Sequence, residues 1–361
     1  MPKLKISTFL AALAATSLSA MVLAVSPADA QTRELRYTDW GPDKGIRADA
    51  LKWFDQELRE RTNNELGLEF YWGGVLLGPS NAMQGIASGA ADIGSATPPY
   101  EPGVIVSWEA ADVPQISDEW VGMRAAYDLM TTHPAALDEF KAQGLHYVSN
   151  MTTGPMQLVS RDPIKTVADI QNKKIRATGS FVDAFDAVGA TAVSLSNSES
   201  YQALSTGAVD GTSGYWYAIP AYKWGEVAKY VTELNLGQFL AFGIVMNDQV
   251  YESLTDSQKK VVDGLGEDFI DHMAERVYRA RVGTREQIRT GSDDIEKMEI
   301  FEPSEDLRQE LLVAAEEAGM DWIGEAETKS LPAEELLQKF RDRIKHYEDL
   351  REKNGYPWGS E

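Results

Sequence analysis

The chain has 361 residues, a formal net charge of −22 and no cysteine, and 43% of its residues are hydrophobic. The negative charge argues against a nucleic-acid partner and against adhesion to anionic lipid, because both require a concentrated positive surface. The lack of cysteine excludes disulfides, thiolate metal sites and cysteine nucleophiles.

The first thirty residues have the order of a secretory signal. Lys3 and Lys5 precede an apolar run over residues 9–25, and small residues follow up to Ala30. This order predicts a signal peptide of residues 1–30 with cleavage after Ala30. The alternative is an uncleaved anchor, because the apolar run is near the lower length limit for a spanning helix. We expect export, and no membrane insertion after cleavage.

The next part of the chain predicts a β-α-β-α-β unit. Apolar residues at Leu35 and Tyr37 indicate a first strand, and Leu51, Phe54 and Leu58 fall on one face of a helix. Further extended segments are predicted for residues 68–72 and for a buried stretch at 91–94.

The same alternation recurs in the middle of the chain. Extended segments are predicted at 157–160, 175–177 and 191–195, with a helix over 181–188. Ser196 and Glu199 form a capping box for another helix, which Gly207 ends.

A long helix is predicted to begin after Thr255, where Gln258 completes a second capping box. Leu265, Phe269, Met273 and Val277 then repeat every four residues. About 330 residues after the signal favour two domains. We therefore expect an α/β fold with two open, mainly parallel sheets flanked by helices and braced by the long helix, with a ligand at the carboxyl edges of the strands.

No motif indicates catalysis. His133, His146, His272 and His346 are scattered without zinc-ligand spacing, and Gly211-Thr212-Ser213-Gly214 lacks the G-x-S-x-G pattern. No G-x-G-x-x-G or P-loop sequence occurs. We expect no metal, no cofactor and no enzymatic activity. A pair of carboxylates in a glycosidase-like cleft is the alternative that the residues leave open.

The most informative stretch is KKIRATGS at 173–180, followed by LSNSESYQALSTGAVDG at 195–211. It resembles the substrate-binding proteins of tripartite ATP-independent periplasmic (TRAP) transporters, the DctP-type family, with their patterns K-x-R-V-P-x-S and S-E-x-Y-x-A-L-x-T-G-x-V-D-G. A glycine-rich segment over 78–94 and Leu254-Thr255 with Gln258 are similar to other parts of that family, so the resemblance covers nearly all of the chain after the signal.

The resemblance implies a two-lobed, class II-like periplasmic binding protein. Lobe I would contain residues 31–153 and about 242–281, and lobe II residues 154–241 and about 282–361. It further implies location in the periplasm, capture of a small organic anion and delivery to TRAP permease subunits. An ABC-type solute receptor and, less directly, an exported hydrolase or lyase are the alternatives.

Arg176 is the candidate anchor for the ligand. In the family, an arginine at this position forms a bidentate salt bridge with the ligand's carboxylate. A guanidinium group also offers a planar fork that matches a carboxylate or sulfonate and stays charged when desolvated. The alternative from the residues alone is a basic surface patch with Lys173 and Lys174.

Three departures from the family pattern bear on the ligand. Met156 stands where several relatives have a second arginine, Gly214 replaces an asparagine, and Asp39 occupies the place of another asparagine. We include these three positions in the predicted site. They favour a partly apolar anion, such as an aromatic or short-chain carboxylate, over a sugar acid.

Five aromatic residues complete the predicted site: Trp40, Trp72, Tyr201, Tyr215 and Trp216. Trp40 and Trp216 follow predicted strand ends, and Tyr201 matches the E-x-Y of the family pattern. The alternative for each ring is a place in the core or at the rim.

Overall fold

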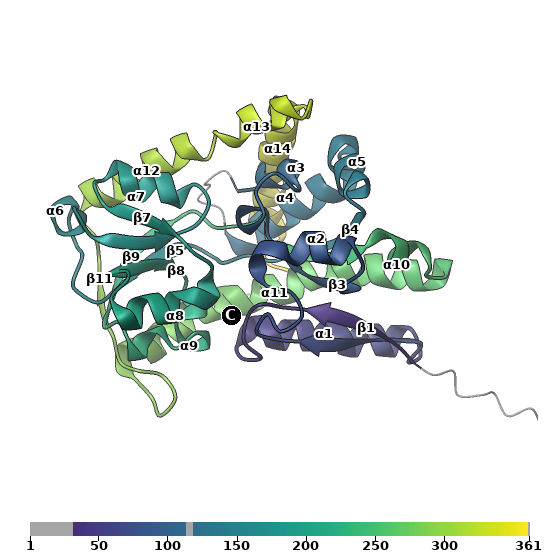
Figure 1. Cartoon of the computed structure of the whole chain (residues 1–361), viewed down its shortest axis with the longest axis horizontal. Coiled ribbons are helices and arrows are strands. Elements are labelled where there is room, and N and C mark those ends of the chain that lie inside the picture. The colour runs from purple at the N-terminus through teal and green to yellow at the C-terminus, as the bar shows by residue number, and fades with distance from the viewer. Residues whose placement is uncertain (1–31, 113–117, 360–361) are drawn as a thin grey trace, which may run out of the picture. The chain divides into compact units, whose positions relative to one another are not determined.

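The computed structural model describes residues 32–112 and 118–359. The predicted signal peptide of residues 1–30 lies outside these ranges. Thr32–Glu361 forms one compact unit, and most of its helices and many of its strands are labelled in Figure 1. Within the described ranges, no helix is both long enough and apolar enough to cross a membrane.

The first sheet contains, in spatial order, β2 (Leu66–Tyr71), β1 (Arg33–Thr38), β3 (Ile93–Ala96), β10 (Gly243–Asn247) and β4 (Leu145–Asn150). Strand β1 pairs in parallel with both of its neighbours, so that Tyr37 lies between Phe70 and Ile93. Strand β10 pairs antiparallel with both β3 and β4. It is therefore the one strand of this sheet that runs against the others.

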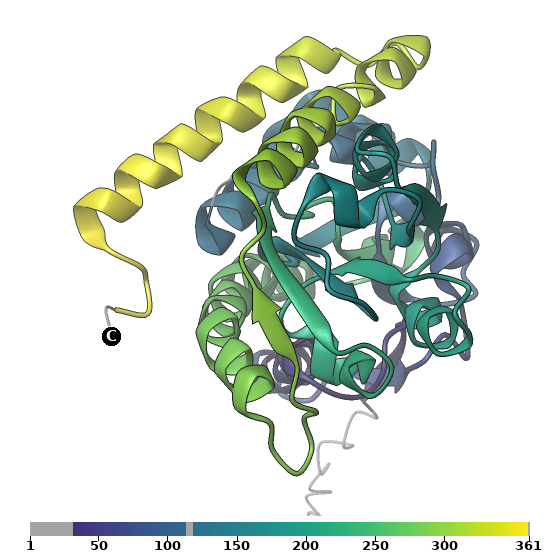
Figure 2. The same cartoon turned by 90° about the vertical axis from the view of Figure 1, so that its left-hand side faces the viewer.

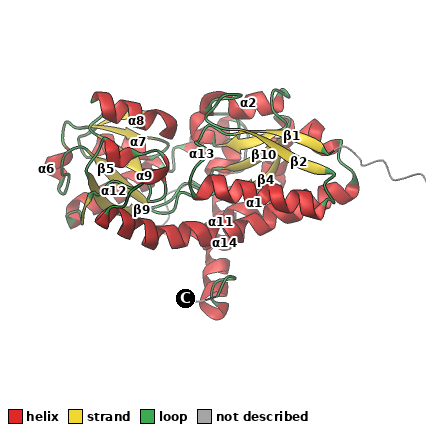
Figure 3. Ribbon diagram, turned by 90° about the horizontal axis from the view of Figure 1, so that it is seen from below, coloured by secondary structure: helices red, strands yellow, loops and turns green. Residues whose placement is uncertain are grey.

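Helices flank this sheet (Figure 3). In α1 (Ile46–Arg61), the predicted apolar face of Leu51, Phe54 and Leu58 is buried. The other elements of this part are η1 (Pro79–Asn81), α2 (Ala82–Ala87), η2 (Pro98–Tyr100), α3 (Val106–Glu109), α4 (Glu119–Thr132), α5 (Pro134–Ala142) and α10 (Asp248–Glu252).

The second sheet contains, in spatial order, β11 (Glu299–Phe301), β9 (Tyr230–Leu236), β5 (Met156–Ser160), β8 (Gly211–Gly214), β6 (Lys174–Ala177) and β7 (Thr191–Ser194). Its parallel pairs are β11–β9, β6–β7 and β6–β8. Strand β5 is antiparallel to β8 and β9. Each sheet is thus mainly parallel, as predicted, and each has one reversed strand.

Short helices surround the second sheet: α6 (Val167–Ile170), α7 (Phe181–Ala187), α8 (Asn197–Thr206), α9 (Ala218–Ala221) and η3 (Trp224–Glu226). The predicted ends of α8 are confirmed. Ser196 and Glu199 form a reciprocal capping box, and Gly207 adopts a left-handed φ of 72° at the C-cap, a conformation that glycine reaches without steric cost.

Helix α11 (Asp256–Thr290) is the predicted long helix, and it has 35 residues. Thr255 and Gln258 form its capping box, and its apolar face from Leu265 to Val277 is buried. It packs on α1, α4 and β4, and near its end Arg285 forms an ion pair with Glu233 of β9. It therefore contacts elements of both sheets, as the bracing role requires (Figure 3).

The C-terminal part consists of α12 (Glu305–Ala318), α13 (Trp322–Thr328) and α14 (Ala333–Asn354). Helix α12 packs on α7, whereas α14 packs on α4, where the rings of Trp120 and Tyr347 meet edge to face at 5.6 Å. Figure 2 shows α14 in yellow.

The α/β fold class with two helix-flanked sheets is confirmed. The chain passes from the strands of the first sheet to those of the second near residue 153 and returns near residue 242. Helix α14, which the prediction includes in lobe II, packs on α4, a helix that contacts β4 of the first sheet. Because Thr32–Glu361 forms one compact unit, the division into lobes stays a prediction.

Candidate functional site

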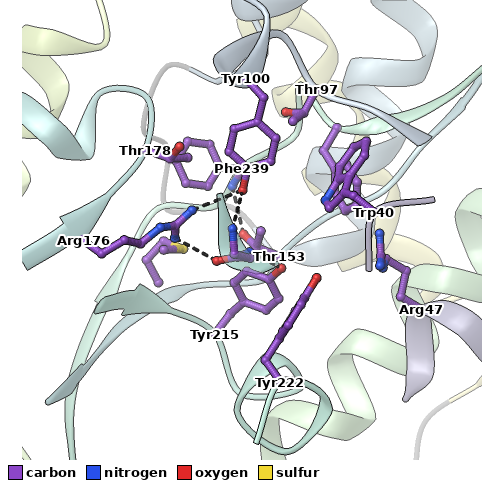
Figure 4. A pocket seen from close by; sticks show the side chains of 13 residues that line it. Trp40, Arg47, Thr97, Tyr100, Thr153, Arg176, Thr178, Tyr215, Tyr222 and Phe239 are labelled. Atoms are coloured by element: carbon purple, nitrogen blue, oxygen red, sulfur yellow. Dashed lines mark hydrogen bonds between the residues drawn. The ribbon is translucent and has the colours of Figure 1, made fainter. Parts of the chain in front are cut away.

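A pocket is lined by residues from both sheet regions (Figure 4). It holds about 480 Å³ of space free of protein atoms, counting solvent at its mouth. The lining residues are Trp40, Arg47, Thr97, Tyr100, Thr153, Met156, Arg176, Thr178, Asn197, Tyr215, Tyr222, Phe239 and Phe242.

The pocket lies where several strands end. Trp40 follows β1, Thr97 follows β3, Thr178 follows β6 and Tyr215 follows β8. Ligands of open α/β sheets bind outside the carboxyl ends of the strands. Thr153, Phe239 and Phe242 come from the two segments that connect the sheets, so residues of both sheets and of both connections meet around one space.

Arg176, near the end of β6, is 2% exposed. Its Nε donates to the carbonyl of Leu195 at 2.7 Å, and its Nη1 donates to Asn197 Oδ1 at 2.7 Å and to the carbonyl of Ser213 at 3.3 Å. Its Nη2 donates to Tyr100 Oη at 3.2 Å. These acceptors are all uncharged, and they engage four of the five N–H donors of a guanidinium.

Arg176 forms no ion pair with any residue that the structure describes. A buried charge is costly unless an opposite charge accompanies it. The burial also separates Arg176 from the surface lysines, since Lys174 is exposed. The guanidinium therefore presents an uncompensated positive charge to the pocket.

Two hydroxyl groups beside Arg176 have capacity for a further hydrogen bond. Tyr100 Oη accepts from Arg176 Nη2 and, at 3.1 Å, from the backbone N–H of Asn197, so its own proton is left to donate. Thr178 Oγ1 is buried and has no hydrogen-bond partner among the described residues. A buried polar atom without a partner, such as Thr178 Oγ1, is uncommon in folded proteins. Tyr100 and Thr178 both line the pocket.

Two tyrosines of the pocket, Tyr215 and Tyr222, are held in their neutral form. Burial raises the pKa of Tyr215 well above its usual value of 10.0, and burial raises the pKa of Tyr222 to about 12, against the opposing charge of Arg47. Asn197 Nδ2 donates to Tyr215 Oη at 2.8 Å. Tyr215 and Tyr222 thus add polarity to the pocket without adding negative charge near neutral pH.

A second guanidinium, that of Arg47, lines the pocket from α1 and lies across it from Arg176 in Figure 4. It differs from Arg176 in having an acidic partner, since its Nη2 lies 2.7 Å from Asp39 Oδ1. Asp39 is fully buried. Burial by itself lowers the pKa of Arg47, but the charge of Asp39 outweighs it and raises the pKa above the usual range.

Aromatic rings form much of the remaining wall. The rings of Trp40 and Tyr100 meet edge to face at 5.8 Å, and Trp40 lies 6.1 Å from Phe242. Phe239 contacts Phe181 at 5.4 Å. Such a wall suits an apolar or planar body between the two arginines.

Four of the predicted site residues line this pocket: Arg176, Trp40, Met156 and Tyr215. Three others lie behind its wall. Asp39 holds Arg47, Gly214 ends β8, and Trp216 is buried against a smaller cavity beside Val277. A Cβ atom at Gly214 would lie 2.5 Å from the ring of Trp224, so packing accounts for the glycine.

The remaining two predicted residues lie away from the pocket wall. The ring of Trp72 stacks on Phe70 at 4.8 Å, at the end of the edge strand β2. Tyr201 Oη donates to Glu226 Oε2 at 2.8 Å.

Sequence reasoning missed several wall residues, above all Arg47, Tyr100, Asn197, Tyr222 and Phe239. Two of them carried a signal. Tyr100 follows a strand end across two prolines, and Asn197 lies next to the capping serine of α8. The others depend on how distant segments come together.

The described residues contain no group of three or more acidic or histidine side chains that could hold a metal ion. The histidines have other roles. His133 caps α5, and His272 stacks on Trp53 at 3.7 Å, where burial lowers its pKa to about 3. None of the histidines lines the pocket just described.

Comparisons with known proteins agree on one family. The chain matches the model of bacterial extracellular solute-binding protein, family 7 (DctP), over residues 38–324. Among curated relatives, it is 25% identical to the ectoine-binding periplasmic protein TeaA of Halomonas elongata over 57% of this chain and 59% of TeaA. The chain thus spans less than two thirds of that relative.

Solved structures are similar as well. A TRAP periplasmic solute-binding protein of Desulfovibrio salexigens, in an open complex, matches with a TM-score of 0.68 and 25% identity, covering 89% of this chain and 97% of that one. A marine metagenome TRAP solute-binding protein specific for aromatic acid ligands matches with a TM-score of 0.76 and 24% identity, covering 87% of this chain and 99% of that one. At this identity, the second match supports the fold alone.

Proposed function

The chain belongs to bacterial extracellular solute-binding protein family 7, and from this premise we propose that it captures a small organic anion in the periplasm and delivers it to a TRAP permease. The family comprises solute receptors rather than enzymes. The prediction that the chain is not an enzyme therefore holds, and neither the ABC-type receptor nor the hydrolase alternative has an observation in its favour.

The observation that carries this proposal is the buried, unpaired guanidinium of Arg176. It is 2% exposed, and its described partners are all neutral. A carboxylate or sulfonate would supply the missing charge, and its two oxygens match the fork of the guanidinium. Tyr100 and Thr178 would add hydroxyl donors to the same anionic group.

The body of the ligand is proposed to be apolar or aromatic. Trp40, Phe239, Phe242 and Met156 form the wall beyond Arg176. The ligands of relatives do not transfer directly, since one relative is named for ectoine and another, 26% identical over 65% of this chain, for C4-dicarboxylates. The ligand of this chain must therefore follow from its own pocket.

Capture is proposed to involve closure of two lobes, residues 31–153 with about 242–281 and residues 154–241 with about 282–361. Tyr100 of the first part contacts Arg176 of the second through the hydrogen bond to Nη2. An anion that touches both groups would stabilise the closed form, because it binds that form better than the open one.

A titration tests the anchor. Benzoate and benzenesulfonate are compared with benzamide, which has a similar shape but no charge, by isothermal titration calorimetry and by tryptophan fluorescence. We expect the two anions to bind and benzamide not to bind measurably. Arg176→Ala should weaken benzoate binding by about a hundredfold or more, because it removes a buried, hydrogen-bonded charge partner.

Two variants serve as controls. Lys174→Ala removes an exposed charge two residues away and should leave the affinity unchanged. Arg176→Lys keeps the charge but loses the fork, so its affinity should fall between those of the wild type and Arg176→Ala. Equal affinities for benzoate and benzamide, or for wild type and Arg176→Ala, would contradict the proposal.

A neighbouring gene for a two-subunit permease without an ATPase would distinguish a TRAP system from an ABC system.

A further inference from the structure

Arg47, on the side of the pocket opposite Arg176 (Figure 4), forms a buried ion pair with Asp39. Asp39 Oδ1 accepts from the backbone N–H of Gly41 at 2.5 Å and from Arg47 Nη2 at 2.7 Å, and Asp39 Oδ2 accepts from Ser95 Oγ at 2.7 Å. Tyr37 Oη shares a hydrogen bond of 3.0 Å with the same serine hydroxyl. Both carboxylate oxygens are thus engaged, which fixes the position of Asp39 and through it that of Arg47.

Several N–H donors of the Arg47 guanidinium are available to a ligand. Its bond to Asp39 is the one hydrogen bond that it makes within the part of the chain that the structure describes. Its guanidinium lies 5.9 Å from the centre of the Phe242 ring and lines the pocket. A guanidinium has five N–H donors, so Arg47 can offer several to a ligand while Asp39 compensates its charge.

The pocket offers the ligand one uncompensated positive charge, although two arginines line it. Arg47 and Arg176 are the charged side chains among the lining residues, and Asp39 neutralises the first of them. One positive charge, that of Arg176, is left for the ligand. A ligand with two carboxylates would place its second charge beside the Arg47–Asp39 pair, whose charges already compensate each other, in a buried site where an unpaired charge is costly.

We propose that the ligand is a monoanion with an uncharged hydrogen-bond acceptor, such as a hydroxyl or carbonyl oxygen, at the end away from its acidic group. Arg176 binds the anion, the aromatic wall covers the body, and the Arg47–Asp39 pair recognises the distal acceptor and rejects a second carboxylate. This inference deepens the proposed function and rests on it.

Matched aromatic acids test this selectivity. Benzoate, the 3- and 4-hydroxybenzoates and the corresponding benzene dicarboxylates differ in one substituent, and calorimetry gives their affinities for the purified protein. We compare the 3-substituted acids with one another and the 4-substituted acids with one another, and take the series with the higher affinity. In that series, the affinity for the hydroxybenzoate should be about tenfold higher than that for benzoate, because a hydrogen bond to a charged donor contributes about this much. The dicarboxylate should bind at least about tenfold more weakly than benzoate.

Two variants examine the ion pair itself. Asp39→Asn leaves the charge of Arg47 uncompensated, so it should raise the affinity for the dicarboxylate above that for benzoate. If this variant does not fold by circular dichroism, the neutral pair Asp39→Asn with Arg47→Gln remains informative. In this double variant, the hydroxybenzoate should bind no more tightly than benzoate, because the donors that recognise the hydroxyl group have been removed.

The outcomes separate the two proposals. If benzoate binds no better than benzamide, the proposed function fails. If benzoate binds through Arg176 but the dicarboxylate binds as tightly as the hydroxybenzoate in the wild type, the function stands and the selectivity inference is overturned. The mass of a compound released from the protein purified from its native host gives an independent measure, since a dicarboxylate there would also overturn the inference.

Discussion

Two buried arginines face one pocket, and they differ in what compensates their charge. Arg47 has the carboxylate of Asp39 at 2.7 Å, whereas Arg176 has carbonyl, amide and phenol oxygens as its described partners. The comparison teaches that burial alone does not identify an anion anchor. A buried cation without an acidic partner does identify one, because its burial is costly unless a ligand supplies the negative charge.

The largest effect is expected at the paired arginine. Arg47→Ala leaves Asp39 as a buried, unpaired carboxylate, and breaking such a pair costs about 3 to 5 kcal/mol of folding stability. Urea denaturation of the protein without ligand should show this loss as a lower midpoint with an unchanged slope.

Lys52→Ala is the matched control. Lys52 lies on the same helix and pairs with Asp43, but both side chains are 49% exposed, and exposed pairs contribute about 1 kcal/mol or less. If Arg47→Ala and Lys52→Ala lower the stability equally, the ion pair with Asp39 is not the buried framework contact that the comparison assumes.

A smaller effect is expected at the residue that orients the unpaired arginine. Asn197 Oδ1 accepts from Arg176 Nη1 at 2.7 Å, and its Nδ2 donates to Tyr215. Asn197→Ala should lower the affinity for benzoate by about tenfold, the value of one hydrogen bond to a charged group. The charge of Arg176 remains, so some binding should persist.

Gln202→Ala on the same helix provides the reference, because Gln202 is exposed and should leave the affinity unchanged. Calorimetry on the two variants measures the difference. A loss at Asn197→Ala as large as that at Arg176→Ala would indicate that the helix start, rather than the orientation of the guanidinium, determines binding.

Much of the framework around these arginines could be predicted from local patterns. The capping boxes at Ser196 and Thr255, the glycine that ends α8 and the apolar faces of α1 and α11 all lie where the sequence placed them. These features depend on residues within a few positions of one another. Arg176 is predicted as the anchor by the resemblance to the family pattern, whereas the local residues alone also allow a basic surface patch with Lys173 and Lys174.

Arg47 could not be found from such patterns. Its position depends on the packing of α1 and on the space left by Gly41, where a Cβ atom would collide with the guanidinium of Arg47. Asp39 was predicted as a ligand contact, but Arg47 stands between it and the pocket. The order of strands was also hidden from the sequence, and it places Trp72 at the end of the edge strand β2 rather than at the pocket.

The smallest expected effect is that of pH on the affinity for benzoate. Measuring this affinity at several pH values tests whether a titrating group belongs to the pocket. Guanidinium groups stay charged in proteins, no histidine is among the lining residues, and burial raises the pKa of Tyr222 to about 12. Ionisation of Tyr222 would add a negative charge that opposes the anion, but only as the pH approaches that value. The affinity for benzoate should therefore change by less than about twofold between pH 6 and 9.

The affinity must be measured directly, because folding stability is expected to depend on pH over the same range. Burial, with the negative charges of Asp112 and Glu325, raises the pKa of Glu109 to about 8, and burial raises that of Asp112 to about 7. The folded state then keeps protons that the unfolded chain loses near its ordinary carboxyl pKa, so stability falls as the pH rises from about 4.5 to 8. Glu109→Gln should reduce this fall without changing the affinity for benzoate. A drop in affinity that follows the stability curve would mean that the acidic groups outside the pocket, and not the two arginines alone, control binding.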